Sequence, residues 1–273
     1  MAPTLNIVGA GKVGRVLGRL FADHGAFTVQ DVLTRSKGSA MEAAGFIGAG
    51  NPVAEMASMR TADAWMLAVT DDQIGPACAQ LAQLQPLSGA LVFHCSGAKS
   101  SAALEAAALA GAATASVHPV RSFADPAFVA KHFAATFCGI EGDPRALTML
   151  DTALAAIGAQ PVPIDAAAKT VYHAASVFAS NYLVTVMDAA LRAYQAAGIP
   201  EQTARAMAAP LAAETLANVL RLGPGAALTG PIARGDFDTV GRQQDALDVW
   251  DSDTGALYRA LAQATLGLAQ RRQ

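Results

Sequence analysis

The sequence has little charge and few lysines. Of its 273 residues, 15% are charged and 53% are hydrophobic, a composition that excludes a disordered or polar-tract protein. Nineteen basic and 22 acidic residues give a net charge of −3, so nothing indicates a basic surface for nucleic acid or for an anionic membrane. Lysine occurs only at Lys12, Lys37, Lys99, Lys131 and Lys169, which makes each position worth examining singly.

Cysteines and uninterrupted apolar runs are also scarce. The three cysteines, Cys78, Cys95 and Cys138, are odd in number and widely spaced, which argues against a disulfide framework or a zinc site, and we predict no metal site. No run of about 18 apolar residues lacks a polar interruption, so no membrane-spanning helix is expected. The first five residues lack the basic region of a secretory signal. These features predict a cytoplasmic protein with reduced, buried thiols.

Short apolar runs alternate with helical patterns over the first 165 residues. The runs cover residues 5–9, 28–33, 64–69, 90–94, 114–118, 134–139 and 160–164. Helical patterns lie between most of them, at residues 12–23, 73–83, 100–110 and 144–157. Strands that alternate with helices form crossover units in a mostly parallel sheet. The predicted fold class is therefore α/β, with an N-terminal, doubly wound Rossmann domain at residues 1–165.

The pattern becomes helical after residue 165. Helices are expected at residues 166–197, 201–222 and about 239–271, so residues 166–273 should form an all-α domain for substrate binding and dimerisation. Pro210 should kink the second helix. The first helix, about 45 Å long at 1.5 Å per residue, is too long and too apolar for the other two to cover. We therefore expect a homodimer built through the C-terminal helices.

A glycine-rich loop opens the chain. Residues 6–14 read as a strand, a Gly-x-Gly-x-x-Gly loop and the start of a helix. Gly9 permits the tight turn, Gly11 lets the backbone approach a pyrophosphate, and Gly14 lets the helix pack close to the strand. Free N–H groups at the helix N-terminus then favour the diphosphate of a dinucleotide. The alternative is a purely structural glycine turn. The predicted cofactor-binding residues of this loop are Gly9, Ala10, Gly11, Lys12, Val13 and Gly14.

The end of the second strand favours NADP over NAD. An NAD site usually has an acidic residue there, whereas this strand ends in Thr34, Arg35 and Ser36, which offer a guanidinium group and two hydroxyl groups to a phosphate. Asp31 lies three residues too early to reach a ribose. We therefore predict NADP(H) as the cofactor. The alternative is that Arg35 and Lys37 belong to a solvated turn.

Two later strand ends should border the same ligand, because ligands of open α/β sheets lie beyond the carboxyl ends of the strands. We expect Val69, Thr70 and Asp71 along the path from the adenosine to the nicotinamide. Ser96 and Gly97 should lie near the nicotinamide. Asp71 is equally suited to cap the helix that begins near residue 73.

A polar stripe marks the first C-terminal helix. Lys169, His173, Ser176 and Ser180 are spaced by 4, 3 and 4 residues, which places them on one face of an otherwise apolar helix. Because buried polar groups need partners, such a stripe lines a site or pairs within a subunit interface. We predict Lys169 as the acid/base, since desolvation favours its neutral form, and His173 as its assistant. Ser176 and Ser180 are expected to contact the substrate. The alternative is a solvent-facing lysine and a bonded core histidine.

Several segments together carry a resemblance to a known family. They are the glycine loop, Thr34-Arg35-Ser36, Val69-Thr70-Asp71-Asp72, His94-Cys95-Ser96-Gly97, His118-Pro119-Val120-Arg121-Ser122-Phe123, Lys169 with Tyr172-His173-Ala174-Ala175, and Thr229-Gly230-Pro231-Ile232-Ala233-Arg234-Gly235-Asp236. They resemble a bacterial group of Rossmann-like NADP oxidoreductases with a C-terminal domain of unknown function. That group is related to pyrroline-5-carboxylate reductase, the deazaflavin-dependent NADP reductases and the 6-phosphogluconate and β-hydroxyacid dehydrogenases. In the wider superfamily a catalytic lysine stands where Lys169 does, and an asparagine stands where this chain has His173.

The resemblance implies hydride transfer between NADPH and a small carbonyl, imine or hydroxy acid. The alternatives are a non-catalytic NADP-binding sensor or scaffold, and a deazaflavin-dependent NADP oxidoreductase. His118 either faces the substrate or is a bonded core histidine, and it rivals Lys169 as the acid/base, as does His94. Arg234 binds either an anionic substrate group or the Lys169 helix of a partner subunit, and Asp236 is suited to cap the last helix.

Overall fold

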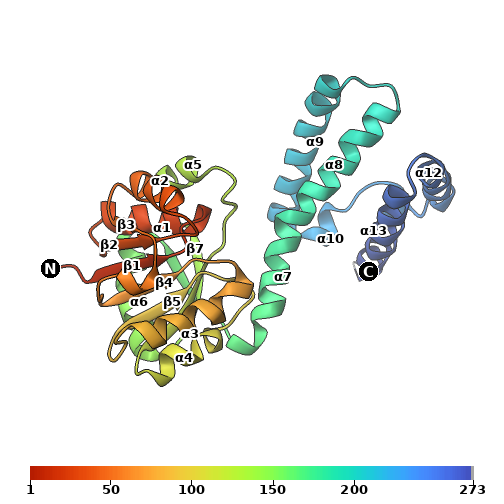
Figure 1. Ribbon diagram of the computed structural model, residues 1–273. Helices are drawn as coiled ribbons and strands as arrows, with labels where there is room; N and C mark the ends of the chain where they lie inside the picture. Colours follow the sequence, from red (N-terminus) through yellow and green to blue (C-terminus); the bar gives the residue numbers. More distant parts are fainter. Residues whose placement is uncertain (272–273) are drawn as a thin grey trace. The chain divides into compact units, whose positions relative to one another are not determined.

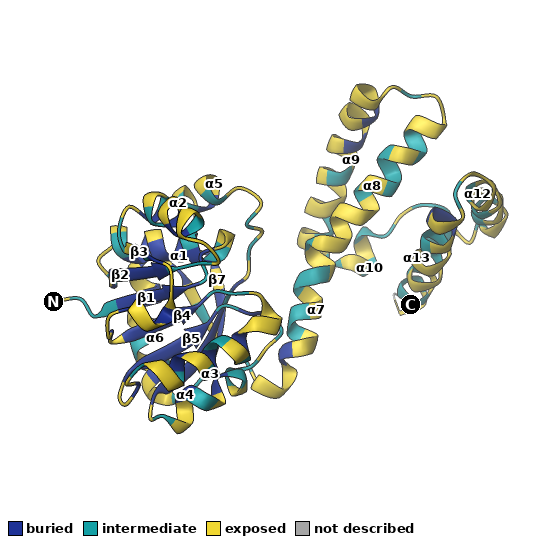
Figure 2. Cartoon of the chain, in the orientation of Figure 1, coloured by how far each residue is buried: buried dark blue, intermediate teal, exposed yellow. Residues whose placement is uncertain are grey.

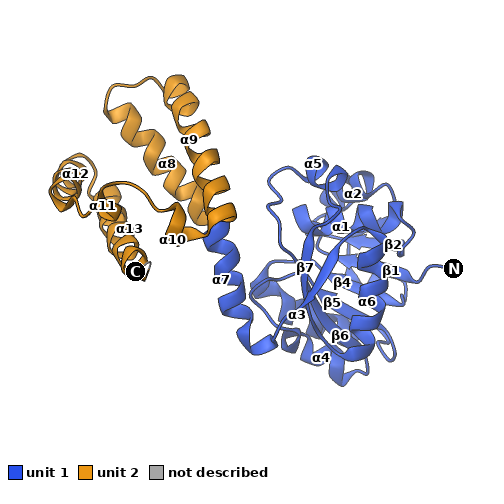
Figure 3. Ribbon diagram, turned by 180° about the vertical axis from the view of Figure 1, so that it is seen from behind, with its two compact units in different colours: residues 1–180 blue, residues 181–273 orange. Residues whose placement is uncertain are grey.

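The computed structural model describes residues 1–271 and divides the chain into two compact units (Figure 1, Figure 3). The first unit is Met1–Ser180 and the second begins at Asn181. We expected the boundary at residue 165. The difference arises because helix α7 (Lys169–Ala179) belongs to the first unit, where its polar side chains bind those of the sheet.

The first unit is built on a sheet of eight strands in the order β3-β2-β1-β4-β5-β6-β7-β8. Its strands are β1 (Thr4–Val8), β2 (Thr28–Leu33), β3 (Asn51–Val53), β4 (Ala64–Leu67), β5 (Leu91–His94), β6 (Ala113–Pro119), β7 (Phe137–Gly142) and β8 (Gln160–Pro163). Neighbouring strands are parallel except β6 and β7, which are antiparallel. The predicted α/β fold with a mostly parallel Rossmann sheet is therefore confirmed. Strand β3 was not predicted, because it is only three residues long and contains Pro52.

Helices cover both faces of this sheet. They are α1 (Lys12–Asp23), α2 (Lys37–Ile47), α3 (Ile74–Leu84), α4 (Glu105–Leu109), α5 (Pro126–Lys131) and α6 (Pro144–Ala156), followed by α7. The side chains of β4 are buried on both faces of the sheet, because Met66 belongs to one buried cluster while Trp65 and Leu67 belong to the other. The carboxyl ends of β1, β4, β5 and β6 lie along one edge of the sheet, since these strands run parallel.

The second unit is entirely helical within its described residues. It contains α8 (Asn181–Ala196), α9 (Glu201–Leu222), α10 (Pro224–Ala227), α11 (Pro231–Arg234), α12 (Phe237–Trp250) and α13 (Ser252–Arg271). Two expected helices are each broken in two. Helix 166–197 is interrupted at Ser180 (φ −130°, ψ −73°), and helix 239–271 at Asp251 (φ −156°, ψ 104°), whose carboxylate accepts from the backbone N–H of Asp253. Helix α9 includes Pro210 without interruption, and Asp236 caps α12 by accepting from the N–H of Thr239.

Burial differs sharply between the units (Figure 2). The first unit holds nearly all of the buried side chains, whereas only Ala204, Ala208, Thr254 and Gly255 are buried among residues 181–271. Residues 166–196, with a mean hydropathy of 1.3 over 18 residues, are long and apolar enough to cross a membrane by length and composition alone. The break at Ser180 divides this stretch.

Candidate active site

The glycine loop connects β1 to α1. Gly9 has a φ of +84°, and its N–H donates to the carbonyl oxygen of Leu33 over 2.8 Å. A Cβ at Gly9 would lie 2.7 Å from Cγ1 of Val69, and one at Gly14 would lie 2.6 Å from the carbonyl oxygen of Gly9. These two glycines are therefore required by the fold itself, whatever the loop binds.

Gly11 is different, because a Cβ there would have no neighbouring atom of the chain within 4 Å. It stands as the N-cap of α1, where no side chain satisfies the first N–H groups of the helix. An open glycine at a helix N-terminus is the geometry that a diphosphate requires.

The other predicted residues of this loop have structural partners. Ala10 is buried and Val13 packs against the apolar core. The Lys12 ammonium donates to the carbonyl oxygen of Ala124 over 3.0 Å and so ties the segment after β6 to the start of α1.

The turn after β2 carries an arginine whose side chain is exposed. Arg35 is exposed and makes no hydrogen bond or ion pair within residues 1–271. The Ser36 hydroxyl caps α2 by accepting from the N–H of Ser39, and the Thr34 hydroxyl donates to the carbonyl oxygen of Ser36. These contacts fix the turn on which Arg35 stands, beside the N-terminus of α2.

Asp31, by contrast, forms an ion pair with Arg60. Its buried carboxylate pairs with the Arg60 guanidinium at 2.6 Å and accepts from the Arg60 N–H. Burial opposes ionisation of Asp31, but the hydrogen bonds and charge of Arg60 lower its pKa overall. Asp31 is therefore not available to recognise a ribose hydroxyl.

The predicted residues after β4 and β5 lie at the carboxyl edge of the sheet. Val69 packs against Gly9, while Thr70 and Asp71 are exposed, and Thr70 rather than Asp71 is the cap of the short 3-10 turn Asp71–Gln73. The Ser96 hydroxyl accepts from two backbone N–H groups of its own loop. Gly97 lies against two histidine rings, since a Cβ there would be 2.7 Å from Nε2 of His118 and 2.4 Å from Nδ1 of His173.

Lys169 ends in a buried polar network. Its side chain, 3% exposed, donates to the Ser116 hydroxyl and pairs with the Glu141 carboxylate at 3.4 Å. Glu141 in turn accepts from the N–H and the hydroxyl of Ser101 over 2.8 and 2.7 Å. Burial lowers the pKa of Lys169, and the charge of Glu141 opposes that shift.

A second contact joins α7 to β6. The Tyr172 hydroxyl and Nδ1 of His118 are hydrogen-bonded at 2.8 Å. Ser116 and His118 are two residues apart on one face of β6, and Lys169 and Tyr172 are three apart on one face of α7, so the helix meets the strand at two points. His173 stands beside them, with its ring edge-to-face with that of His118 at 5.5 Å.

The three histidines of this region differ in what their nitrogens bind. His94 is fully buried, and both nitrogens contact backbone groups, Nε2 the carbonyl oxygen of Ser100 and Nδ1 the N–H of Ser96. In His118, Nε2 has no hydrogen-bond partner within residues 1–271. Nδ1 of His173 is buried without a partner. Burial, together with the charges of His173 and Lys169, lowers the pKa of His118 to about 4.

The remaining predicted residues are less tightly held. Ser176 lies on the face of α7 that carries Lys169, whereas Ser180 stands at the break that ends this helix. Both residues are half-buried, and their hydroxyls make no hydrogen bond within the described chain. Arg234 is exposed in α11 of the second unit. Glu141 and Ser116 were not predicted as site residues, and Tyr172 was named only as part of the family resemblance. Only Tyr172, three residues after Lys169, carried a signal in its spacing.

Comparison with known proteins identifies the two parts of the chain. Residues 3–119 match a Rossmann-like domain, and residues 136–265 match the domain of unknown function DUF2520. The chain thus combines a Rossmann-like domain with a C-terminal DUF2520 domain, as the resemblance implied. No curated protein matches the chain.

Solved structures share this fold over nearly the whole length. A proposed NADP oxidoreductase from Bacteroides fragilis is 20% identical with a TM-score of 0.81, over 97% of this chain and 98% of that one. A protein from Thermotoga maritima is 25% identical with a TM-score of 0.73, over 98% of each chain. A reductive aminase from Aspergillus terreus, solved in complex with NADPH, is 15% identical with a TM-score of 0.66, over 99% of this chain and 93% of that one.

Proposed function

We propose that this chain is an NADP(H)-dependent oxidoreductase acting on a small carbonyl, imine or hydroxy acid. The observation that carries the proposal is the glycine loop, in which Gly9 and Gly14 are closely packed but Gly11 faces open space at the start of α1. That difference is what a loop needs in order to bind a diphosphate rather than merely to turn. The fold shared with oxidoreductases supports the proposal.

The residues present fit NADP(H). The free N–H groups of α1 suit the diphosphate, and Arg35, with no partner of its own, suits the 2′-phosphate beside the N-terminus of α2. When bound, NADPH would supply the hydride. The pairing of Asp31 with Arg60 leaves this turn without a carboxylate that would repel the phosphate.

His118 is the residue that we propose moves the proton. Its Nε2 is the ring nitrogen without a partner, and Tyr172 holds its Nδ1. In the tautomer whose Nδ1–H donates to the Tyr172 oxygen, Nε2 is a free base. It would take the proton from a substrate hydroxyl during oxidation and return it during reduction.

Lys169 then has a positioning role in place of the acid/base role that its helix position predicts. Its ammonium already binds Ser116 and Glu141 and is shielded from solvent. By fixing the start of α7 on the sheet, it sets Tyr172 against His118. His173 remains a residue that we propose borders the substrate.

The cofactor proposal is tested by Gly11→Ala with Gly45→Ala as a matched control. Neither added Cβ meets an atom of the chain within 4 Å, so both variants should fold. We expect Gly11→Ala to weaken NADPH binding at least tenfold in a fluorescence titration, because its methyl group occupies the space of the diphosphate. Gly45→Ala, inside α2, should bind as the unchanged protein does. Equal binding by all three proteins would contradict the proposal.

The reaction is tested by following NADPH consumption with a panel of keto acids, ketones and cyclic imines. We expect turnover with at least one compound, and a loss of about 10²–10⁴-fold in His118→Ala at unchanged NADPH affinity. Tight NADPH binding without turnover would identify the sensor or scaffold instead. Turnover only with a deazaflavin would identify the deazaflavin-dependent reaction.

A further inference from the structure

The loop that follows β5, residues 96–101, forms one side of the candidate site, and we call it the β5 loop. We propose that Glu141 and Ser116 are positioning residues that hold this loop, one at each end, by joining it to Lys169. Their effect on the reaction rests on the proposed function, whereas the contacts that carry the inference all lie within the first unit.

Glu141 fixes the far end of the β5 loop. Its carboxylate accepts from the N–H of Ser101 over 2.8 Å and from the Ser101 hydroxyl over 2.7 Å, and it pairs with the Lys169 ammonium at 3.4 Å. The Glu141 side chain is 6% exposed, so these donors replace the water that would otherwise solvate its charge. The carboxylate therefore joins β7, α7 and the end of the loop in one cluster.

Ser116 fixes the near end of the same loop. Its hydroxyl accepts from the Lys169 ammonium and donates to the carbonyl oxygen of Ser96 over 3.3 Å. Ser116 is fully buried on β6, two residues before His118 and on the same face of the strand. The ammonium of Lys169 thus reaches both ends of the β5 loop, each through one intervening side chain.

Further hydrogen bonds tie the two ends of the loop to one another. The Ser96 hydroxyl accepts from the N–H groups of Ala98 and Lys99 over 3.1 and 2.9 Å. The ring of His94 accepts from the N–H of Ser96 at Nδ1, over 3.2 Å, and its Nε2 lies 3.0 Å from the carbonyl oxygen of Ser100. A loop that is held at both ends and bonded internally opens less often than a free one.

Gly97 is the residue that this loop places beside the histidines of the site. A Cβ at Gly97 would lie 2.7 Å from Nε2 of His118 and 2.4 Å from Nδ1 of His173. Neither nitrogen has a hydrogen-bond partner within residues 1–271. A shift of the loop would therefore change the space at the nitrogen that we propose moves the proton. A displacement of about 1 Å at a reacting group can cost about 10²-fold in rate.

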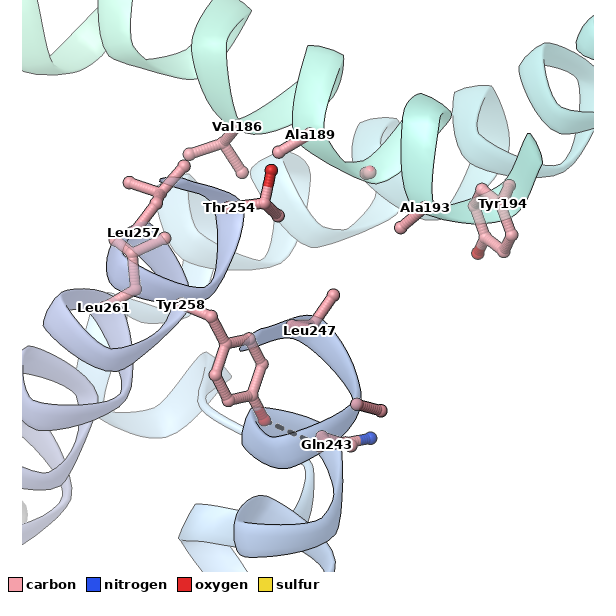
Figure 4. A pocket seen from close by; sticks show the side chains of 12 residues that line it. Val186, Ala189, Ala193, Tyr194, Gln243, Leu247, Thr254, Leu257, Tyr258 and Leu261 are labelled. Atoms are coloured by element: carbon pink, nitrogen blue, oxygen red, sulfur yellow. Dashed lines mark hydrogen bonds between the residues drawn. The ribbon is translucent and has the colours of Figure 1, made fainter. Parts of the chain in front are cut away.

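The groove of the helical unit, by contrast, holds no such arrangement. It has a volume of about 640 Å³ and lies between α8, α12 and α13 (Figure 4). The Tyr258 hydroxyl in its wall donates to Gln243 over 2.7 Å, and no lysine, histidine or acidic side chain is among the described residues that line it. This groove therefore offers no unpaired base and no charge to be positioned.

Ser101→Ala is the mildest test, because it removes one hydroxyl group and keeps the ion pair of Glu141 with Lys169. Hydrogen exchange followed by mass spectrometry on the full chain should show the amides of residues 96–101 exchanging about tenfold faster, since a hydrogen bond to a carboxylate is lost. Ser101→Thr restores a hydroxyl group and should restore the protection. Ser116→Ala, which frees the other end, and Glu141→Gln, which also breaks the ion pair, should accelerate exchange at least as much.

Phe21→Leu is the matched control for a general loss of stability. Phe21 is buried near the end of α1 and packs edge-to-face against Phe27, with ring centroids 5.2 Å apart, at the edge of the sheet where β2 begins. This variant weakens the core of the first unit without touching the β5 loop. Exchange in residues 96–101 should therefore be that of the unchanged protein.

Turnover separates positioning from a purely structural role. With a compound that the unchanged protein turns over, Ser101→Ala and Ser116→Ala should lower kcat about tenfold or more and leave the KM for NADPH nearly unchanged, because the glycine loop is not altered. Ser101→Thr should restore kcat, and Phe21→Leu should keep it.

Two results would overturn the proposal. One is exchange of residues 96–101 at the unchanged rate in both serine-to-alanine variants, and the other is faster exchange with an unchanged kcat. If the unchanged protein turns over none of the compounds, the proposed function fails. The exchange rates then decide by themselves whether Ser116 and Glu141 hold the β5 loop.

Discussion

The two units of this chain differ in how far they bury their apolar side chains. The first encloses its sheet between helices on both faces, and even the charged pair Lys169–Glu141 lies inside it. The second has helices of ordinary length and composition but almost no interior. Helix formation by itself therefore does not make a domain. The parallel sheet closes because each crossover returns a helix to its face, whereas the helical hairpins have no such constraint.

Helix α7 shows the contrast within one element. Its face toward the sheet carries the polar side chains of Lys169, Tyr172 and His173, while Val171 on another face is 75% exposed. A surface helix of a globular protein usually has the opposite arrangement. The polar face is explained by the bonds that it makes to β6 and β7.

The strongest test of this contrast is to break the buried pair. Lys169→Met leaves the Glu141 carboxylate buried with only the Ser101 donors, and we expect a loss of about 3–5 kcal/mol in the free energy of unfolding measured in urea. The double variant Lys169→Met/Glu141→Gln should recover most of that loss, because no uncompensated charge remains.

Arg145→Met is a suitable control for that experiment. Arg145 pairs with Asp143 at 3.6 Å on the surface of the same unit, with a side chain that is 68% exposed. We expect a change of no more than about 1 kcal/mol. A Lys169→Met variant as stable as this control would show that the buried network does not hold α7 on the sheet.

The sequence predicted the first unit better than the second. Alternating apolar runs and turn residues located seven of the eight strands, since their pattern is local. The breaks at Ser180 and Asp251 were missed, because neither residue interrupts the apolar periodicity that predicts a helix. The stripe of Lys169 and His173 was predicted because its helical spacing is also a local pattern in the sequence. Its partner Glu141 was not, because it comes from a strand that pairs antiparallel with β6, a long-range contact.

A smaller effect is expected at the exposed end of β2, which contrasts with the buried network of the same unit. Arg35→Ala removes an unpaired guanidinium group and should leave the fold intact. We expect NADPH binding to weaken about tenfold, or about 1.4 kcal/mol, while NADH binding stays nearly unchanged. Paired fluorescence titrations measure both. An equal loss for the two cofactors would contradict a 2′-phosphate contact.

The smallest effect concerns the pH dependence of the first unit. The pKa of His118 is about 4 in the folded chain, below its value of 6.5 in an unfolded chain, so the unfolded state binds more protons between these values. The contribution of His118 to the free energy of unfolding should therefore be fully present above pH 6.5 and should be lost as the pH falls toward 4. His118→Gln should reduce the loss between pH 7 and pH 5.5 by about 1 kcal/mol, measured from thermal unfolding at both pH values. A residual loss is expected from His94, whose pKa burial also lowers. His24→Gln, at an exposed position after α1, should keep the full loss. An equal pH dependence in the two variants would mean that solvent reaches the His118 ring freely, and that the carboxyl edge of the sheet is no more enclosed than the surface of the helical unit.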